Sequence, residues 1–351
     1  MKREKIDIMN MARPSVKKLK PYASAKDEFK DFDQQLIYLD ANENPYDNGL
    51  NRYPDPHQSV LKERISELKG VAVEKILLGN GSDEILDMIF RVFFEPAKDN
   101  IIINTPTFGM FKVLCGINNV NYKEVSLTEE FELDVTKIVE SIDENTKAIF
   151  VCSPNNPTGN SMKKEGVEAL LSKGLLVVID EAYIDFSEKK SWNQELDKYK
   201  NLIVTQTFSK AYGMAGIRLG VCYADSEIIT LLKKVKMPYN ISVLTQQTAL
   251  KQLEDQRVTE QEVVEIVENR KKLVRELSGI NLVKKVYPSD SNFLLIKVDD
   301  ADLRYNELIG HDLVIRNRSK EPLCENCLRI TIGTPSENKA LIKSLTYLDT
   351  K

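Results

Sequence analysis

The 351-residue sequence has no apolar run long enough to cross a bilayer and no excess of positive charge. Its 53 aspartates and glutamates outnumber its 49 lysines and arginines, which argues against nucleic acid as a partner. The first eleven residues are charged and lack an apolar core, so they do not predict a secretory signal. We therefore expect a cytoplasmic protein with neither a membrane nor a nucleic-acid partner.

Histidine and cysteine are scarce. The two histidines are His57 and His311, and two of the five cysteines, Cys324 and Cys327, form a CxxC pair. Such a pair can be redox-active or form half of a zinc site, but the sequence has no second CxxC. No metal site is predicted, and the other three cysteines are expected to pack as small core residues.

Short apolar runs alternate with helix-like stretches from about residue 59 to residue 224. Because these runs are continuous, they predict strands buried on both faces of a mostly parallel sheet, with helices on both sides. Six strands are expected, at residues 74–78, 100–104, 147–152, 175–180, 201–206 and 219–223. In such sheets ligands bind at the carboxyl ends of the strands, which is where most of the polar motifs lie.

The chain is predicted to have four parts. Residues 1–45 lack a strand–helix pattern and are expected to form an arm that packs with the small domain or a partner subunit. Residues 46–245 form the large domain, and residues 246–280 are connecting helices. Residues 281–351 predict a small α+β domain, with strands at 283–287, 293–298, 313–315 and 328–332.

Residues 79–84, GNGSDE, follow the first strand and open a helix. Glycines allow a tight turn, and the free N–H groups at a helix start can hold a phosphate. Alternatively, Ser82 could simply cap a helix whose first-turn acids complement its dipole. A dinucleotide-binding fingerprint would need a third glycine at position 84, which is glutamate. On this motif alone, helix capping is the favoured interpretation.

Two further polar motifs follow buried strands. Residues 153–159, SPNNPTG, are turn formers that also place an asparagine amide at a strand end. Asp180 ends an apolar strand, where a carboxylate is costly unless it is paired. Its partner could be an arginine or the cationic ring nitrogen of a ligand, which Tyr183 could also reach.

The segment at residues 205–220 places Thr207, Ser209, Lys210 and Arg218 within twelve residues of one another. Hydroxyl and guanidinium groups hold phosphates, and an amine forms an imine with an aldehyde. The set suits an aldehyde-bearing phosphate, and it makes an ordinary surface lysine a poor explanation.

In order and separation, these motifs resemble those of the fold-type I pyridoxal-phosphate aminotransferases, over nearly the whole chain. The resemblance implies a large domain with a mostly parallel seven-stranded sheet sandwiched by helices, plus a smaller α+β domain. It implies that pyridoxal phosphate is bound covalently by Lys210, with Asp180 beside its ring nitrogen. Lys210, Asp180 and Tyr183 are the catalytic residues expected on this basis, and Lys210 would take the α-proton of the substrate.

The same resemblance assigns the other cofactor contacts. Tyr183 and Asn156 resemble the pair that hydrogen-bonds the ring 3-oxygen, and Phe108 resembles the aromatic residue stacked on the ring. The residues expected at the cofactor phosphate are Ser82, Asp83, Thr207, Ser209 and Arg218.

Residues 19–22 (LKPY), 39–45 (LDANENP) and 51–55 (NRYPD) resemble the histidinol-phosphate aminotransferase subgroup. This implies a homodimer in which Tyr53 reaches the cofactor phosphate of the neighbouring subunit. It also implies substrate contacts from Tyr22, Asn42, Glu43 and Asn156.

The C-terminal arginines complete the resemblance. Arg329 resembles the residue that binds the substrate carboxylate across the wider family. In the subgroup, Arg316 and Arg329 together would hold the phosphate of histidinol phosphate, since a guanidinium suits either anion. Alternatively, Arg316 could be an ordinary surface arginine, and Arg318 beside it is interpreted as one.

The implied reaction transfers the amino group of L-histidinol phosphate to 2-oxoglutarate, which gives imidazole-acetol phosphate and L-glutamate in histidine biosynthesis. The alternatives are an aromatic amino-acid aminotransferase, a threonine-phosphate decarboxylase, and a non-enzymatic sensor that keeps the fold. The paired arginines and the N-terminal motif favour histidinol phosphate. The complete set of cofactor groups argues against a sensor.

Overall fold

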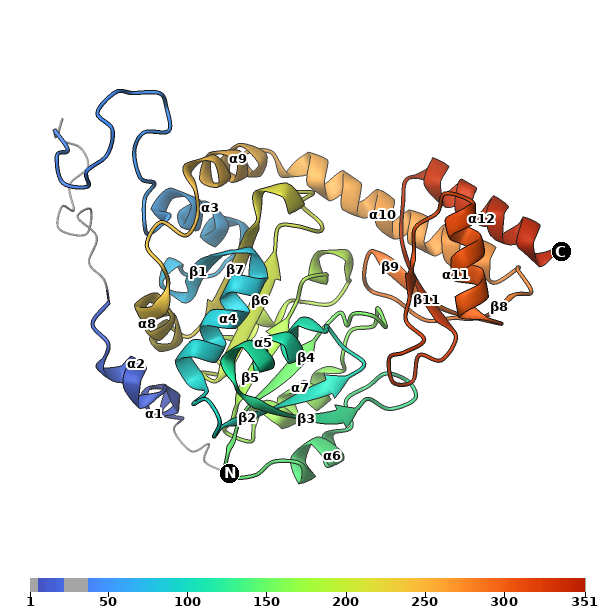
Figure 1. Cartoon of the computed structure of the whole chain (residues 1–351), viewed down its shortest axis with the longest axis horizontal. Helices are drawn as coiled ribbons and strands as arrows, with labels where there is room; N and C mark the ends of the chain where they lie inside the picture. Colours follow the sequence, from blue (N-terminus) through green and yellow to red (C-terminus); the bar gives the residue numbers. More distant parts are fainter. Residues whose placement is uncertain (1–5, 22–36, 351) are drawn as a thin grey trace.

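The computed structural model describes residues 6–21 and 37–350. Its two sheets lie at opposite ends of a long connecting helix (Figure 1). Within these residues, no helix combines the length and apolar character needed to cross a bilayer.

The large sheet has seven strands in the order β1-β7-β6-β5-β4-β2-β3. They are β1 (Ile76–Asn80), β2 (Asn100–Thr105), β3 (Asn121–Ser126), β4 (Thr146–Cys152), β5 (Leu176–Asp180), β6 (Leu202–Thr207) and β7 (Leu219–Ala224). Only β7 runs antiparallel to its neighbours, so the predicted mostly parallel seven-stranded sheet is confirmed. Strand β3 was not among the predicted strands, because this edge strand buries only Val125 and so has no apolar run.

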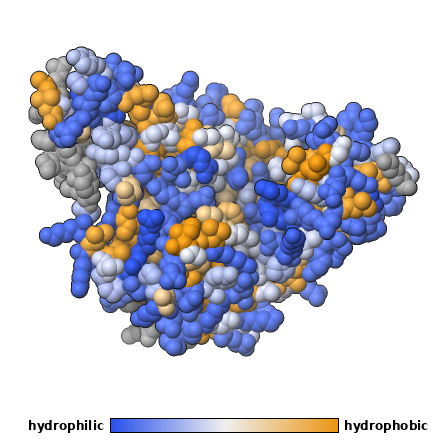
Figure 2. Space-filling view, in the orientation of Figure 1, coloured by the Kyte–Doolittle hydropathy of each residue, from blue (hydrophilic) through white to orange (hydrophobic). Residues whose placement is uncertain are grey.

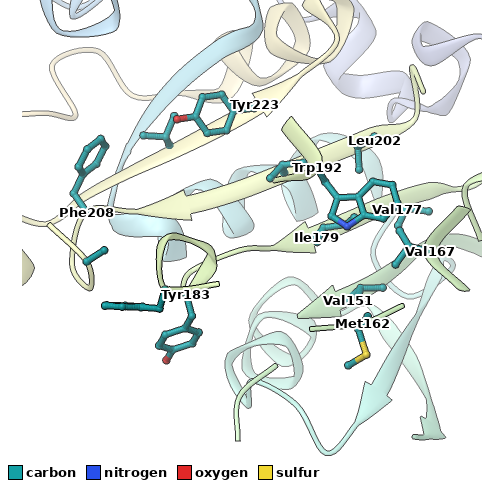
Figure 3. Close-up of a cluster of buried hydrophobic side chains, with 14 of the residues drawn as sticks. Val151, Met162, Val167, Val177, Ile179, Tyr183, Trp192, Leu202, Phe208 and Tyr223 are labelled. Atoms are coloured by element: carbon teal, nitrogen blue, oxygen red, sulfur yellow. The ribbon is translucent and has the colours of Figure 1, made fainter. Parts of the chain in front are cut away.

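Helices cover both faces of this sheet. Alternate residues of one strand enter different cores: Ile149 and Val151 enter one, and Ala148 and Phe150 enter the other. The first core, part of which is drawn in Figure 3, includes α3 (Ser59–Lys69), α7 (Lys164–Leu171) and α9 (Val243–Leu253). The second includes α4 (Gly81–Phe93), α5 (Met110–Asn118) and α8 (Ser226–Val235). The first core also includes Ile138 of α6 (Val135–Glu140).

Helix α10 (Gln256–Leu277) leads to a four-stranded antiparallel sheet in the order β10-β11-β9-β8. Its elements are β8 (Val283–Val286), β9 (Phe293–Val298), α11 (Ala301–Gly310), β10 (Arg316–Asn317), β11 (Cys327–Thr331) and α12 (Pro335–Asp349). The strand expected at residues 313–315 is wrong, because pairing with β11 begins only at Arg316. The side chain of Ile315 is buried in a third core, which the small sheet forms with α10, α11 and α12.

The N-terminal segment contains α1 (Ile8–Met11) and α2 (Pro14–Lys18). Ile8, Ala12 and Val16 are buried in the same core as α4 and α8, and the N–H of Arg13 donates to the Val92 carbonyl at 2.9 Å. This segment was expected to pack with the small domain or a partner subunit, and residues 8–18 do not contact the small domain. Their apolar side chains recur every fourth residue and cover the large domain instead. The domain boundaries themselves stay a prediction.

Candidate active site

A cavity of about 230 Å³ lies at the carboxyl ends of β4, β5 and β6. Its lining comprises Ser82, Asp83, Phe108, Cys152, Asn156, Asp180, Ala182, Tyr183, Thr207, Ser209, Lys210 and Arg218. Apart from Cys152 and Ala182, all of these are predicted cofactor residues. Parallel strands end at the same edge of a sheet, which is why motifs far apart in the sequence meet here.

One end of this cavity is the start of α4, which lies against β7. Gly81 has a φ of +77°, and its N–H donates to the Arg218 carbonyl at 2.9 Å. A Cβ on Gly81 would lie 2.7 Å from Arg218 Nη2, and a Cβ on Gly220 would lie 2.4 Å from the backbone nitrogen of Ser82. Only glycine at these two positions lets the helix start approach the strand so closely. Asn80, and not Ser82, is the N-cap residue, so the Ser82 hydroxyl is not used as an N-cap.

Hydroxyl groups and a guanidinium meet at the same end. Thr207 Oγ1 and Ser209 Oγ lie 3.0 Å apart, and Arg218 Nη1 donates to Ser209 Oγ at 3.5 Å. Arg218 Nη2 is 3.7 Å from Asp83 Oδ2. Donors of three kinds, namely hydroxyl, guanidinium and helix N–H, therefore converge on one point, and this arrangement suits a phosphate.

Asp180 is the buried acid of the cavity, with only 2% of its surface exposed. Its Oδ1 accepts hydrogen bonds from the Ala182 N–H at 3.2 Å and from Thr205 Oγ1 at 3.3 Å. Burial outweighs these bonds and raises the pKa of Asp180 to about 7. No ion pair among the described residues includes this carboxyl, so a bound cation would be its natural partner.

Lys210 stands at the mouth of the cavity, with its Nζ 5.7 Å from the centroid of the Tyr183 ring. Desolvation lowers the pKa of Lys210, and the charge of Arg329 lowers it further. Both effects favour the neutral amine, which is the nucleophilic and proton-accepting form. Burial raises the pKa of Tyr183, so its phenol stays protonated and can donate a hydrogen bond.

A second cavity, of about 380 Å³, adjoins the first on the side of the small sheet. It shares Asp83, Phe108, Asn156, Tyr183 and Lys210 with the first cavity and adds both Arg318 and Arg329. Arg329 Nη1 donates to Asn156 Oδ1, and its guanidinium lies 5.3 Å from the centroid of the Phe293 ring. These contacts place a cation of the small sheet opposite Lys210.

The two other arginines of this region differ from the prediction. Arg316 is opposite Arg329 in the strand register, but it is exposed and does not line the cavity. Arg318, which was interpreted as a surface residue, does line it. The spacing of two residues was the available signal, because residues i and i+2 of a strand share a face.

The N-terminal substrate motif lies elsewhere in this chain. Asn42, Glu43 and Tyr53 line a third cavity of about 500 Å³, away from Lys210. Glu43 accepts hydrogen bonds from Arg52 Nη1 at 2.7 Å and from the Tyr53 N–H at 2.6 Å. The Tyr53 ring stacks on Tyr239, with centroids 4.4 Å apart. Tyr22 is outside the described residues.

All five cysteines are buried, and none of them forms a disulfide bond. Cys324 lies in the turn that precedes β11, and Cys327 is the first residue of that strand. The residues that the structure describes contain no cluster of three or more histidine, cysteine or acidic side chains suited to a metal ion.

Comparison with known proteins identifies the family. Residues 25–345 match the family described as aminotransferase class I and II. The chain is 57% identical over 346 residues to the histidinol-phosphate aminotransferase of Flavobacterium johnsoniae, covering 98% of this chain and 99% of that protein.

Solved structures agree with this match. The histidinol-phosphate aminotransferase of Clostridium acetobutylicum superposes with a TM-score of 0.79 at 25% identity, covering 86% of this chain and 91% of that one. The enzyme of Sinorhizobium meliloti, solved in complex with pyridoxal-5'-phosphate, gives a TM-score of 0.75 at 22% identity and covers 85% and 83%. The chain therefore belongs to the class I and II aminotransferases and, within them, to the histidinol-phosphate aminotransferases.

Proposed function

We propose that this protein transfers the amino group of L-histidinol phosphate to 2-oxoglutarate, in histidine biosynthesis. The observation that carries the proposal is the 57% identity over nearly the full length to a histidinol-phosphate aminotransferase. The arginines that face Lys210 add support, because both substrates of the reaction bring anions to that side. The rival aromatic aminotransferase and threonine-phosphate decarboxylase share the fold but have no comparable observation in their favour.

Pyridoxal phosphate is the cofactor of this family, and the residues of the first cavity fit it. Ser82, Thr207, Ser209, Arg218 and the N–H groups of α4 would hold its phosphate. Asp180, a buried acid with no cationic partner among the described residues, would hold the protonated ring nitrogen. The flat ring would lie on Phe108, and its 3-oxygen would accept hydrogen bonds from Tyr183 and Asn156.

When bound, this cofactor supplies an electron-accepting ring that stabilises the negative charge left by removal of the substrate α-proton. The side chains of this protein hold the cofactor and transfer the proton. Lys210 would hold the cofactor through its Nζ, and the amine of an incoming substrate would set that Nζ free. The freed Nζ, whose pKa is lowered by burial, accepts the α-proton and later returns it. Asp180 keeps the ring nitrogen protonated throughout.

The wall of the small sheet binds the far end of the substrate. A planar guanidinium pairs equally well with a phosphate or a carboxylate, and the reaction needs both, since histidinol phosphate alternates with glutamate. We assign this role to Arg329, with Arg316 close by in the strand register.

The enzyme is proposed to be a homodimer in which Tyr53, with Asn42 and Glu43, completes the site of the partner subunit. Supporting this, the segment at residues 37–54 projects from the body at the upper left of Figure 1, and Figure 2 shows apolar surface on it. Ile37, Leu39 and Tyr46 each expose more than 80% of their surface there: 87%, 86% and 82%. Exposed apolar groups in one segment indicate a surface that another chain covers.

The free thiols support a cytoplasmic location.

The test is a single-turnover experiment on purified holoenzyme with one amino donor at a time, monitored by the absorbance of the cofactor. Histidinol phosphate and glutamate should each convert the cofactor to its amino form. Conversion by tyrosine or phenylalanine, with none by histidinol phosphate, would overturn the substrate assignment. Protein that binds no cofactor would overturn the proposed chemistry as a whole.

A further inference from the structure

Arg318 lies on the face of the small sheet that borders the active-site cavity. Between it and Arg316, the side chain of Asn317 turns the other way, since its Nδ2 donates to Asp302 Oδ1 on α11 at 2.6 Å. Side chains alternate along extended chain, so the two arginines share the opposite face. The N–H of Arg318 donates to the Cys327 carbonyl at 2.8 Å, which continues the pairing with β11 beyond the end of β10.

The guanidinium of Arg318 has unused hydrogen-bonding capacity. Its Nε is buried and has no hydrogen-bond partner among the described residues. Its ion pair with Glu321 is long, since Nη1 lies 3.9 Å from Oε1, and its side chain is only 27% exposed. A buried donor without an acceptor costs free energy, so contacts within the described residues do not satisfy this guanidinium.

The charges nearby also favour an anion. Arg318 and Arg329 line the same cavity, and Arg316 stands opposite Arg329 in the register. The acid across the cavity, Asp83, is within 3.7 Å of Arg218. Like charges held together by the fold repel one another until an anion binds between them. These arginines together carry more positive charge than one substrate carboxylate would balance.

We propose that Arg318 is a specificity-determining residue, whose guanidinium joins Arg329 in binding a substrate phosphate and so favours a phosphate-bearing amino donor over glutamate. The inference rests on the proposed function and deepens it. A phosphate monoester carries a charge of about −1.5 to −2 near neutral pH and three acceptor oxygens. One bidentate guanidinium satisfies a carboxylate, but a phosphate has oxygens left for a second.

The test compares the wild-type holoenzyme with Arg318→Gln in the two half-reactions. For histidinol phosphate, we expect kcat/KM to fall roughly 10- to 100-fold, mostly through KM, because a charged hydrogen bond to the substrate is lost. For glutamate, we expect a change below about threefold. Inorganic phosphate is a second probe: as an inhibitor of the glutamate half-reaction it should bind Arg318→Gln roughly tenfold more weakly.

Two further variants separate a direct contact from a structural role. Glu321→Gln removes the ion-pair partner of Arg318 but keeps the arginine, so its kinetics should match those of the wild type. Arg318→Lys keeps the charge without the planar fork and should fall between the wild type and Arg318→Gln. Thermal unfolding of each holoenzyme shows whether the variant is folded.

An equal loss with both donors in Arg318→Gln, or the same loss in Glu321→Gln, would overturn the proposal, and so would unchanged kinetics in a folded Arg318→Gln. If the proposed function itself is wrong, the result is distinguishable, because the wild-type protein would then not react with histidinol phosphate. The effect of Arg318→Gln on inhibition by inorganic phosphate would still decide whether this residue binds a phosphate.

Discussion

The two walls of the active site are built in different ways. The large-domain wall stands at the ends of β4, β5 and β6, where nearly all side chains are buried. The small-domain wall depends on β10, an edge strand of only two residues, and the tyrosine proposed to close the site comes from a projecting loop. The chemistry shared by the family therefore rests on the rigid core, while substrate choice rests on elements that few contacts hold. The side chains of the large-domain wall can change only with the fold, whereas those of the small-domain wall can be replaced one residue at a time.

The largest effect is expected at the centre of the large-domain wall. Lys210→Ala removes both the covalent anchor and the proton acceptor, so turnover should fall by about 10⁴-fold or more. Lys210→Arg keeps the positive charge but offers no neutral amine, and it should be equally inactive. Steady-state rates and the absorbance of the bound cofactor measure the two losses. A Lys210→Ala enzyme with more than about a tenth of normal turnover would contradict the assignment.

The neighbouring acids Asp180 and Glu181 offer a matched pair on the same wall. Both are buried, but Asp180 lines the cavity, whereas Glu181 accepts hydrogen bonds from Ser191, Gln206 and the Trp192 N–H. Asp180→Asn should keep the cofactor and lose roughly 10²- to 10³-fold in kcat, because the ring nitrogen is no longer held protonated. Glu181→Gln should keep most of its kcat while its melting temperature falls. Equal loss of kcat in the two variants would show that burial, and not contact with the ring, is what matters.

The projecting loop gives a smaller but distinctive effect. Tyr53→Ala and Lys210→Ala are each expected to be poorly active as homodimers. If Tyr53 acts across the interface, a hybrid dimer regains one site that has both Lys210 and Tyr53. Random mixing of equal amounts makes half of the dimers hybrids, so about a quarter of wild-type activity should return. Activity that stays at the level of the separate variants would place Tyr53 in its own subunit's site.

The difference between the walls also explains how far the sequence could be interpreted. Asp180 ends a long apolar run, and Asn156 and Lys210 each follow such a strand within four residues, so the pattern that predicts the strand also predicts the edge of the sheet that these residues reach. No apolar run surrounds Arg318, and its spacing of two residues from Arg316 does not give the register of this two-residue strand, which is set by pairing with β11. Likewise, β3 has mostly exposed side chains. Ile8, Ala12 and Val16 predict an apolar surface but not which domain it covers.

The smallest effect concerns stability, and it should be confined to the large-domain wall. Burial raises the pKa of both Asp180 and Glu181 to about 7, from 3.8 and 4.5. Between about pH 4 and pH 7, each folded carboxyl therefore keeps a proton that the unfolded chain has lost. The folded state binds more protons, so the free energy of unfolding of the cofactor-free protein should fall as the pH rises through this window and level off above it.

The expected total is on the order of 3 kcal/mol, measured by urea unfolding at pH 5.5 and pH 8. Asp180→Asn should remove part of the slope, because the amide does not titrate. Arg329→Gln, on the other wall and outside the contacts of either acid, should leave the slope unchanged. Added cofactor should also reduce the slope, since a cation beside Asp180 lowers its pKa. A stability that rises from pH 5.5 to pH 8 would mean that these carboxyls are ionised within the fold, and that the core already contains a cation for Asp180.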